Sequence, residues 1–348
     1  MKGAVLTKYK NIEWKDVPVP QIQETEVLVK VTSASICGTD QHIFNGEFHP
    51  RTSLPLIPGH EFVGTIEALG GAVTGFTAGE RVAVDPIIWC GKCPACEIGH
   101  YPACTSLKLL GIDMDGGFAE YVAADKSMLY SIDSSISDRD SALVEPYSIG
   151  YHASKRAGVQ AGDKVAFFGA GKIGQSIMQA ARTISGNSFF IIDVIQKRLD
   201  IAKNAYPDII AINALDNDPV DVIMELTDGR GVDIAFEMTG NTLAIDDRVH
   251  PVREAIRCIR GAGKVCVLSL DDIEISLVMK ELIWKEGLLI TSRVSHGEYR
   301  EALDHLAIGD LRPEALISAV MPMSKTQDAF AMIENEPENY LKVILTVD

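Results

Sequence analysis

The hydrophobic pattern of the chain changes after about residue 125. Before that point, short apolar or alternating runs such as 26–31, 62–66 and 81–84 are separated by Gly and Pro residues. Runs of this length between turn residues predict β-strands, and no long amphipathic helical pattern stands among them. We therefore expect a β-rich, barrel-like domain with irregular loops in this part of the chain.

From about residue 150, continuous apolar runs alternate with helical stretches such as 173–184. Apolar runs of this kind are typical of strands buried on both faces, and their alternation with helices predicts a parallel sheet with right-handed crossovers. The tail is expected to form a helix near 298–307 and a strand over 342–345. The fold class is therefore α/β. The predicted strands of the parallel sheet are 164–168, 189–193, 233–237 and 264–268.

The composition is that of a globular chain, with 47% hydrophobic and 23% charged residues among 348, which suggests about two domains. Lys and Arg number 32 against 48 Asp and Glu, so the net charge is −16. This charge repels phosphate backbones and anionic membranes, so we expect neither nucleic acid nor membrane as a partner. With no long apolar run and no signal-peptide pattern, the sequence predicts a soluble cytoplasmic protein. The acidic pair Asp271 and Asp272 is expected to lie in a solvated loop.

A G-x-G-x-x-G motif follows the first predicted strand of the parallel sheet and opens the helix 173–184. In this context glycines allow a tight turn, a close backbone approach to a pyrophosphate, and an anion at the helix N-terminus. An ordinary strand-to-helix turn is the alternative, and the context disfavours it. The predicted cofactor-binding residues of this motif are Gly169, Gly171, Ile173 and Gly174.

Asp193 ends the next predicted strand, where a carboxylate accepts both ribose hydroxyls and repels a 2′-phosphate. The sequence therefore favours NAD over NADP. Arg198 lies five residues further on and would attract a phosphate; we give it less weight and expect it along the adenosine. Leu268 and Ser269, in the loop after a later strand, are expected to line the nicotinamide.

Four of the seven cysteines crowd into one short segment with the spacing Cys-x2-Cys-x2-Cys-x7-Cys. Without a secretion signal, such crowding indicates metal binding rather than disulfides. Four thiolates leave no position open for a substrate, so a structural zinc is favoured. An iron–sulfur cluster is the competing interpretation, and the net charge disfavours a nucleic-acid-binding zinc module. The predicted ligands are Cys90, Cys93, Cys96 and Cys104.

A second set of metal-ligand residue types is scattered along the chain. Cys37 follows a predicted strand, the pair His60-Glu61 begins 23 residues later, and Glu145 precedes the parallel-sheet region. One thiolate, one imidazole and one or two carboxylates can form an open zinc site that keeps a position for substrate. Taken singly, each of these residues is more often part of a core or of a hydrogen-bonded structure.

A further spacing pattern is formed by Gly59-His60-Glu61, Gly64, Gly70 and Val73. Together with the cysteine segment and the glycine motif, this pattern resembles the zinc-dependent medium-chain dehydrogenases/reductases, the zinc alcohol dehydrogenase family, and the resemblance runs from end to end of the chain. Glu145 falls where the alcohol dehydrogenases proper carry a second zinc cysteine. A glutamate at this position is similar to the polyol (sorbitol-type) dehydrogenases and L-threonine 3-dehydrogenase, and the segment 37–43 is similar to the same two branches.

The resemblance implies a GroES-like zinc-binding catalytic domain over residues 1–149 and 292–348. It also implies a Rossmann NAD-binding domain over 150–291. The family further implies a homodimer or a homotetramer, a small-molecule alcohol as substrate, and two zinc ions per chain.

The implied mechanism places zinc on Cys37 and His60, with Glu61 or Glu145 completing the ligand set, as a Lewis acid toward the alcohol. Thr39 would take the alcohol proton, and the relay would continue through the cofactor ribose to His42. Glu61 is the alternative base, and Asp40 is interpreted as orienting a zinc ligand. By resemblance, Arg293 would bind substrate hydroxyls, with Glu145 also close to the substrate.

The leading hypothesis is NAD-dependent oxidation of a secondary alcohol in a polyol, sugar alcohol or sugar phosphate. L-threonine oxidation is the second, and differs because its pocket must bind an ammonium and a carboxylate. A protein that binds zinc and NAD without catalysis is the third. The joint presence of Cys37, Thr39, His60 and Glu145 argues against it, because such a protein has no need for an open metal site.

Overall fold

The computed structural model describes residues 1–347 except 187–188, 241–248 and 271–273, so the predicted loop at Asp271 and Asp272 lies outside the described residues. The chain divides into two compact units. The first unit is Met1–Glu145 with Tyr299–Asp348, and the second is Pro146–Glu298. These boundaries lie four and seven residues from the predicted ones at 149/150 and 291/292.

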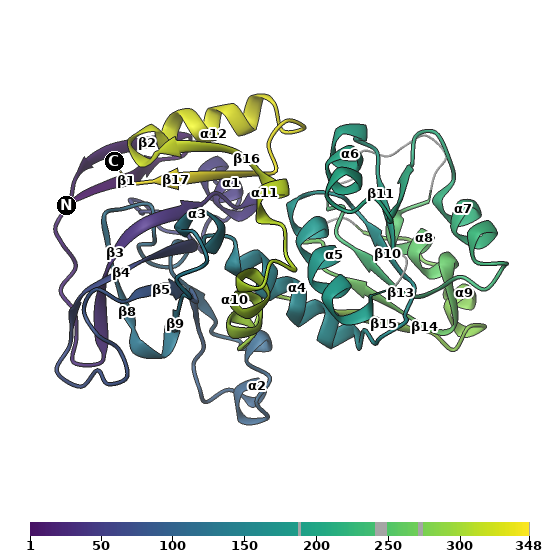
Figure 1. Ribbon diagram of the computed structural model, residues 1–348, viewed down its shortest axis with the longest axis horizontal. Helices are drawn as coiled ribbons and strands as arrows, with labels where there is room; N and C mark the ends of the chain where they lie inside the picture. Colours follow the sequence, from purple (N-terminus) through teal and green to yellow (C-terminus); the bar gives the residue numbers. More distant parts are fainter. Residues whose placement is uncertain (187–188, 241–248, 271–273, 348) are drawn as a thin grey trace. The chain divides into compact units, whose positions relative to one another are not determined.

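The first unit is built around a mainly antiparallel sheet in the order β16-β17-β3-β4-β5-β9, with β8 also paired to β3 (Figure 1). Its long central pair is β3 (Glu26–Ser35) and β4 (Glu61–Leu69). Alternate residues of β3 are buried, as the period-2 pattern predicted. The other strands are β1 (Lys2–Lys8), β2 (Asn11–Asp16), β5 (Arg81–Val84), β6 (Ile87–Ile88), β7 (Lys108–Leu109), β8 (Tyr121–Asp125), β9 (Leu129–Ser131), β16 (Ile317–Pro322) and β17 (Lys342–Thr346).

Short helices connect these strands, and the most important for function is α1 (Gly38–Asn45). Cys37 caps its N-terminus, Asp40 completes the cap by accepting the backbone N–H of Cys37, and Gly46 ends it in the left-handed conformation. The cap therefore fixes Cys37 two residues after the end of β3. The other helices of this unit are α2 (Pro94–Glu97), η1 (Tyr101–Ala103), η2 (Lys126–Met128), α3 (Asp138–Ser141), α10 (Tyr299–Ala307), α11 (Pro313–Leu316), η3 (Met323–Lys325) and α12 (Thr326–Asn335).

The second unit contains a parallel sheet in the order β12-β11-β10-β13-β14-β15. The strand order reverses between β10 and β13, which makes this the switch point of a doubly wound fold. Four of these strands were predicted to within a few residues. The strands are β10 (Val165–Phe168), β11 (Phe189–Asp193), β12 (Ile210–Asn213), β13 (Val232–Glu237), β14 (Ile259–Val267) and β15 (Leu288–Thr291).

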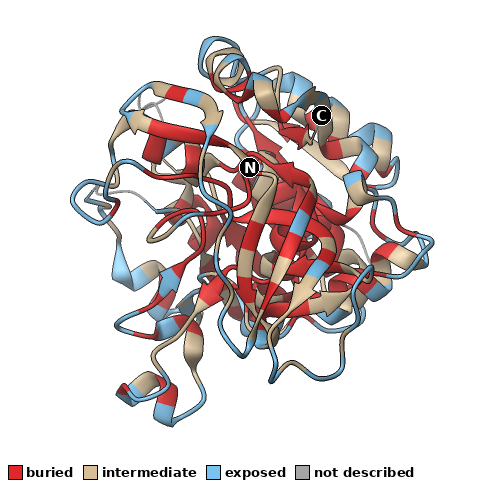
Figure 2. Ribbon diagram, turned by 90° about the vertical axis from the view of Figure 1, so that its left-hand side faces the viewer, coloured by how far each residue is buried: buried red, intermediate tan, exposed pale blue. Residues whose placement is uncertain are grey.

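Helices cover both faces of this sheet because successive strand residues point to opposite sides. Phe167 packs in one apolar core with residues of α5 (Lys172–Ser185), and Phe168 packs in the other with residues of α8 (Pro251–Cys258). In Figure 2 the strands are largely buried and the exposed positions gather on loops and outer helix faces. The remaining helices are α4 (Val144–Ala157), which spans the unit boundary, α6 (Gln196–Ala205), α7 (Pro219–Leu226) and α9 (Met279–Ile283).

Among the described residues, none of the helices has both the length and the apolar character needed to cross a bilayer.

Candidate active site

The structure brings three of the scattered residues together. The sulfur of Cys37, a ring nitrogen of His60 and a carboxylate oxygen of Glu61 lie within 4.8 Å of one another, and all three side chains are buried. They meet because β3 and β4 pair antiparallel with Ser35 opposite Glu61, so the segment that follows β3 lies beside the start of β4. We call Cys37, His60 and Glu61 the mixed-donor cluster.

Asp40 lies behind this cluster and is fully buried. Its carboxylate accepts the backbone N–H of Cys37 at 2.8 Å, and its Oδ1 lies 3.2 Å from Nδ1 of His60. Burial alone would lower the pKa of His60, but the Asp40 carboxylate and the Cys37 sulfur raise that pKa well above its usual value. A carboxylate at one ring nitrogen orients the other nitrogen for a metal, which is the role expected for Asp40.

Glu61 forms a buried ion pair that sequence reasoning missed. Both of its carboxylate oxygens lie 2.5 Å from Nζ of Lys342, and neither side chain is exposed. Burial would lower the pKa of Lys342, but the Glu61 and Cys37 charges raise it. Lys342 reaches the cluster because β17 pairs with the end of β3. The signal in the sequence was a lysine at the start of an otherwise apolar strand.

Glu145, in the first turn of α4, is buried near the same cluster. Burial and the charge of the neighbouring Glu61 raise the pKa of Glu145 to about 8. Two carboxylates and a thiol thus share a buried region with Lys342 and His60. A bound dication would relieve the repulsion among these acidic groups, and sulfur, imidazole and carboxylate are ligands that zinc accepts, so the residues present fit a zinc ion.

Thr39 and His42 both lie on α1, next to the cluster in the sequence. They are three residues apart, so they share one face of the helix. Thr39 is half-buried in the first turn, whereas the His42 side chain is 55% exposed and its Nδ1 pairs with Glu47. This hydrogen bond lowers the pKa of Glu47. One face of the helix therefore carries a hydroxyl near the buried end and an imidazole in contact with solvent.

The four clustered cysteines form a second candidate metal centre, which we call the cysteine lobe (Cys90, Cys93, Cys96 and Cys104). Their sulfurs lie within 4.8 Å of one another, with 3.5 Å between those of Cys93 and Cys96. Hydrogen bonds from the backbone of Cys96 and Thr105 lower the pKa of Cys93 to about 6. Burial and the Cys93 sulfur raise the pKa of Cys96 to about 12. Four converging sulfurs with one readily formed thiolate fit a closed metal site.

The glycine motif forms the turn between β10 and α5 at the switch point. Gly169 has φ +108°, and a Cβ at Gly174 would lie 1.9 Å from the Gly169 carbonyl oxygen, so only glycine fits there. Gly171 caps the N-terminus of α5, and Ile173 packs its side chain against the core of the sheet. The turn thus leaves the helix N-terminus open to an anion, as a pyrophosphate requires.

Asp193 and Arg198 lie beside this turn. The Asp193 carboxylate accepts the backbone N–H of Ala170 at 2.7 Å and that of Ile195 at 2.9 Å. Nη1 of Arg198 lies 3.7 Å from Oδ2 of Asp193. The two opposite charges are therefore neighbours, and the carboxylate is fixed directly against the glycine turn.

The other predicted residues of the second unit lie at the carboxyl ends of later strands. Leu268 and Ser269 follow β14, and the Ser269 hydroxyl donates to the carboxylate of Glu237 at 2.6 Å. Glu237 was not predicted as a site residue; its signal was an acidic residue ending a buried strand. Arg293 is exposed and follows β15. The connection after β15 is held to α4 where Glu298 lies 3.2 Å from Nδ1 of His152.

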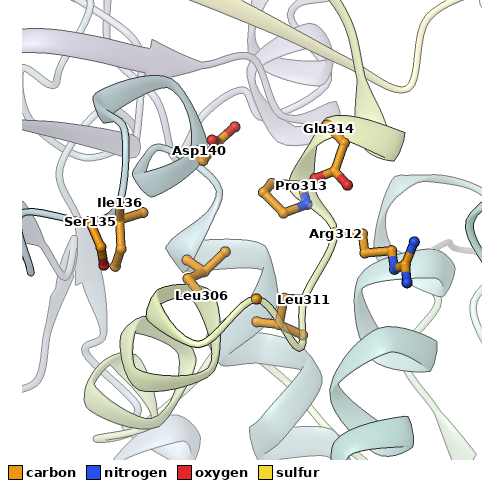
Figure 3. A pocket seen from close by; sticks show the side chains of 9 residues that line it. Ser135, Ile136, Asp140, Leu306, Leu311, Arg312, Pro313 and Glu314 are labelled. Atoms are coloured by element: carbon orange, nitrogen blue, oxygen red, sulfur yellow. The ribbon is translucent and has the colours of Figure 1, made fainter.

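A cavity of about 240 Å³ in the first unit is separate from these residues (Figure 3). It is lined by residues of the segments 135–140 and 306–314, among them Ile136, Leu306 and Glu314. None of the predicted site residues lines it, so we assign it no part in the chemistry.

Comparison with known proteins identifies the class. Residues 23–134 match the model of the alcohol dehydrogenase GroES-like domain, and residues 173–307 match that of the zinc-binding dehydrogenases. A sorbitol dehydrogenase of Bacillus subtilis is 32% identical, covering 99% of this chain and 97% of that protein. An L-threonine 3-dehydrogenase of Bacillus licheniformis is 33% identical, covering 91% of this chain and 90% of that protein. The crystal structure of the Escherichia coli alcohol dehydrogenase rspB with NADH superposes with a TM-score of 0.89 at 29% identity, covering 99% of each chain.

A candidate metal site of mixed ligands in the same chain as a glycine turn at the switch point is typical of a zinc- and nicotinamide-dependent dehydrogenase. The chain belongs to the zinc-type medium-chain dehydrogenases, in the branch of the polyol and L-threonine dehydrogenases. The predicted fold class, a GroES-like domain with a Rossmann domain, is confirmed.

Proposed function

We propose that the protein is an NAD-dependent zinc dehydrogenase that oxidises a secondary alcohol of a polyol, sugar alcohol or sugar phosphate. The observation that carries this proposal is the buried mixed-donor cluster, which joins one sulfur, one imidazole and one carboxylate and is backed by Asp40. Three donors are one fewer than a tetrahedral metal needs, so such a site keeps a position for substrate.

The two donor sets support two zinc ions per chain. Cys37 and His60 would hold the catalytic ion, with Glu61 or Glu145 as the carboxylate ligand, and the cysteine lobe would hold a structural ion. When bound, the catalytic zinc supplies a Lewis acid and NAD supplies the hydride acceptor. Lys342 contacts both oxygens of the Glu61 carboxylate and so fixes its position beside Cys37 and His60.

The proton path uses α1. Thr39 follows the Cys37 ligand by two residues, so its hydroxyl is the group of the chain that we assign to receive the alcohol proton. His42 stands one turn further toward solvent and is assigned the release of that proton. Glu61 remains the alternative base.

Cofactor choice rests on Asp193, whose carboxylate is held at the glycine turn by two backbone N–H groups. A 2′-phosphate placed there would meet a like charge, which supports NAD rather than NADP. Gly169, Gly171 and Gly174 would receive the pyrophosphate. Arg198 is assigned to the adenosine side.

The substrate class is carried over from the relatives of this branch, among which a sorbitol dehydrogenase aligns over nearly the whole chain. L-threonine is the second candidate substrate, on the basis of the L-threonine 3-dehydrogenase relative. Arg293 is assigned to bind substrate hydroxyls if the substrate is a polyol or a sugar phosphate. It would bind the carboxylate if the substrate is L-threonine.

The test is a panel of polyols, hexitol phosphates and L-threonine, scored by the absorbance of NADH. We expect NADH with at least one polyol or sugar phosphate and less with threonine. Threonine as the best substrate would replace the first proposal by the second. No NADH with any alcohol would leave only the zinc- and NAD-binding protein without catalysis.

A homodimer is also part of this proposal. β15 is an edge strand of its sheet, with Leu288 54% and Leu289 40% exposed, and Trp284 beside it is 78% exposed. An uncovered apolar edge strand favours pairing with another chain. Leu289→Lys should convert dimers to monomers in light scattering, whereas Val320→Lys on the exposed edge strand β16 should not. The same oligomeric state in both variants would refute this interface.

The compartment proposed is the cytoplasm. The seven cysteines are free thiols in the structure, and thiolate metal ligands persist where disulfides are kept reduced.

A further inference from the structure

The carboxylate of Glu237 is buried at the end of β13, and within the described part of the chain it accepts hydrogen bonds from residues of two different loops. Its Oε1 accepts the backbone N–H of Thr239 at 2.8 Å and also the Thr239 hydroxyl. Its Oε2 accepts the Ser269 hydroxyl at 2.6 Å. Glu237 is fully buried, whereas Thr239 and Ser269 are only partly so. A buried carboxylate thus joins two partly exposed hydroxyls.

These hydroxyls lie at the edge of the sheet where dinucleotides bind. Thr239 follows β13, and Ser269 follows the neighbouring strand β14. The end of β13 packs directly against the glycine turn, because a Cβ at Gly169 would lie 3.2 Å from the Met238 carbonyl. The carboxyl ends of strands beside the switch point form the ligand-binding edge in doubly wound folds.

The chemistry of a hydroxyl determines which groups donate and which accept in these hydrogen bonds. A hydroxyl has one hydrogen to donate and two lone pairs to accept, whereas an ionised carboxylate only accepts. Glu237 therefore takes the hydrogens of both hydroxyls, and their remaining capacity is acceptance. We propose that Glu237 is a positioning residue that fixes Ser269 and Thr239 as hydrogen-bond acceptors toward the dinucleotide, so that they select cofactor groups that donate.

This inference rests on the proposed function, in which the second unit binds NAD. The donors that NAD offers are its ribose hydroxyls and the amino groups of its carboxamide and adenine. An acceptor pair at this edge fits any of these donors.

The substitution Glu237→Gln would reverse the donor and acceptor roles in the hydrogen bond to one of the two hydroxyls. The amide oxygen must face the backbone N–H of Thr239, which can only donate, so the amide nitrogen must face Ser269. Ser269 would then accept from the amide and turn its own hydrogen outward, against the donor of the cofactor. The shape of the side chain is unchanged, so Glu237→Gln tests the direction of this hydrogen bond rather than the packing of the side chain.

The experiment is a fluorescence titration of the intact protein with NADH. We expect Glu237→Gln to raise the Kd for NADH about tenfold, the size of one reversed hydrogen bond, and Ser269→Ala to raise it about threefold. In the Ser269→Ala background, Glu237→Gln should have little further effect, because the hydroxyl that it reorients is gone. A purely structural role of Glu237 would give the same loss in both backgrounds.

A cofactor analogue identifies the donor. The reduced 3-acetylpyridine analogue of NADH has a methyl group in place of the carboxamide amino group. If that amino group is the donor, the two substitutions leave the Kd of the analogue nearly unchanged; if a ribose hydroxyl or the adenine amino group is the donor, they raise it as for NADH.

Four outcomes would overturn the inference. An unchanged Kd for NADH in Glu237→Gln would refute the inference and leave the proposed function standing. An equal loss of NADH affinity on Glu237→Gln with and without Ser269→Ala would do the same. If Glu237→Gln does not fold, an unchanged Kd in Ser269→Ala decides against it. Failure of the unmodified protein to bind NADH would refute the proposed function itself and this inference with it.

Discussion

The two sulfur-containing sites of the first unit are built in opposite ways. The cysteine lobe takes four identical donors from one short segment, and its sulfurs meet through local turns. The mixed-donor cluster takes three different donors from the ends of β3 and β4, with Lys342 of β17 and Glu145 of α4 beside them. One site is defined by spacing in the sequence, the other by the pairing of the sheet.

This difference accounts for what each site can do. Four thiolates satisfy a tetrahedral zinc completely, so the lobe suits a structural ion. The mixed-donor cluster supplies fewer ligands and surrounds them with ionisable groups, which suits an ion that must exchange a substrate. We therefore expect changes beside the mixed-donor cluster to affect the chemistry, and changes in the cysteine lobe to affect stability.

Among the changes that should leave both metal sites occupied, the largest effect is expected at Thr39. Thr39→Val removes the hydroxyl that we assign to the proton path while keeping the shape, so turnover with the best polyol should fall about 10²- to 10⁴-fold. Zinc content and NADH affinity should stay unchanged. Thr39→Ser should restore much of the rate, and His42→Ala should cost less because solvent reaches that position. Near-normal turnover of the valine variant would point to Glu61 as the base.

The next effect concerns the Lys342–Glu61 pair, which has no counterpart in the lobe. Lys342→Met leaves a buried carboxylate without its ammonium, and should lower the free energy of unfolding by about 3–5 kcal/mol. The double variant Lys342→Met/Glu61→Leu should recover most of this loss, since both charges are gone. Denaturant titration of the metal-free proteins measures both, because Glu61 is itself a candidate zinc ligand. Equal stability of the single and double variants would contradict the account.

The smallest effect is expected in the second unit, and should leave both metal sites intact. Asp193→Ser removes the carboxylate beside the glycine turn, and should shift the ratio of kcat/KM for NAD to that for NADP by about tenfold toward NADP. Zinc content serves as the control. A preference of the unmodified protein for NADP would mean that Arg198 outweighs Asp193.

The sequence predicted those parts of the structure that depend on neighbours along the chain. The strand ending at Asp193, the glycine turn and the cysteine lobe all follow from local spacing, and the structure has them at the expected positions. The helix that carries Glu145 was not predicted, although Pro146 in its first turn is a common helix-start signal.

Contacts between segments that are distant along the chain could not be predicted from the sequence. Lys342 meets Glu61 only because β17 joins the sheet beside β3, and a single lysine in an apolar strand does not reveal its partner. Ser269 meets Glu237 because β13 and β14 are neighbours, which the order of strands along the chain does not by itself specify. Pairing in the sheet, rather than residue type, determines both contacts.

The most direct test of the comparison is the metal content of three proteins by elemental analysis, with turnover measured alongside. The unmodified chain should hold about two zinc ions, and Cys37→Ser and Cys93→Ser about one each. Turnover should fall about 10³-fold or more in Cys37→Ser, while Cys93→Ser should mainly lose thermal stability. A single zinc in the unmodified protein, iron in the lobe, or full metal content and activity in Cys37→Ser would contradict the account.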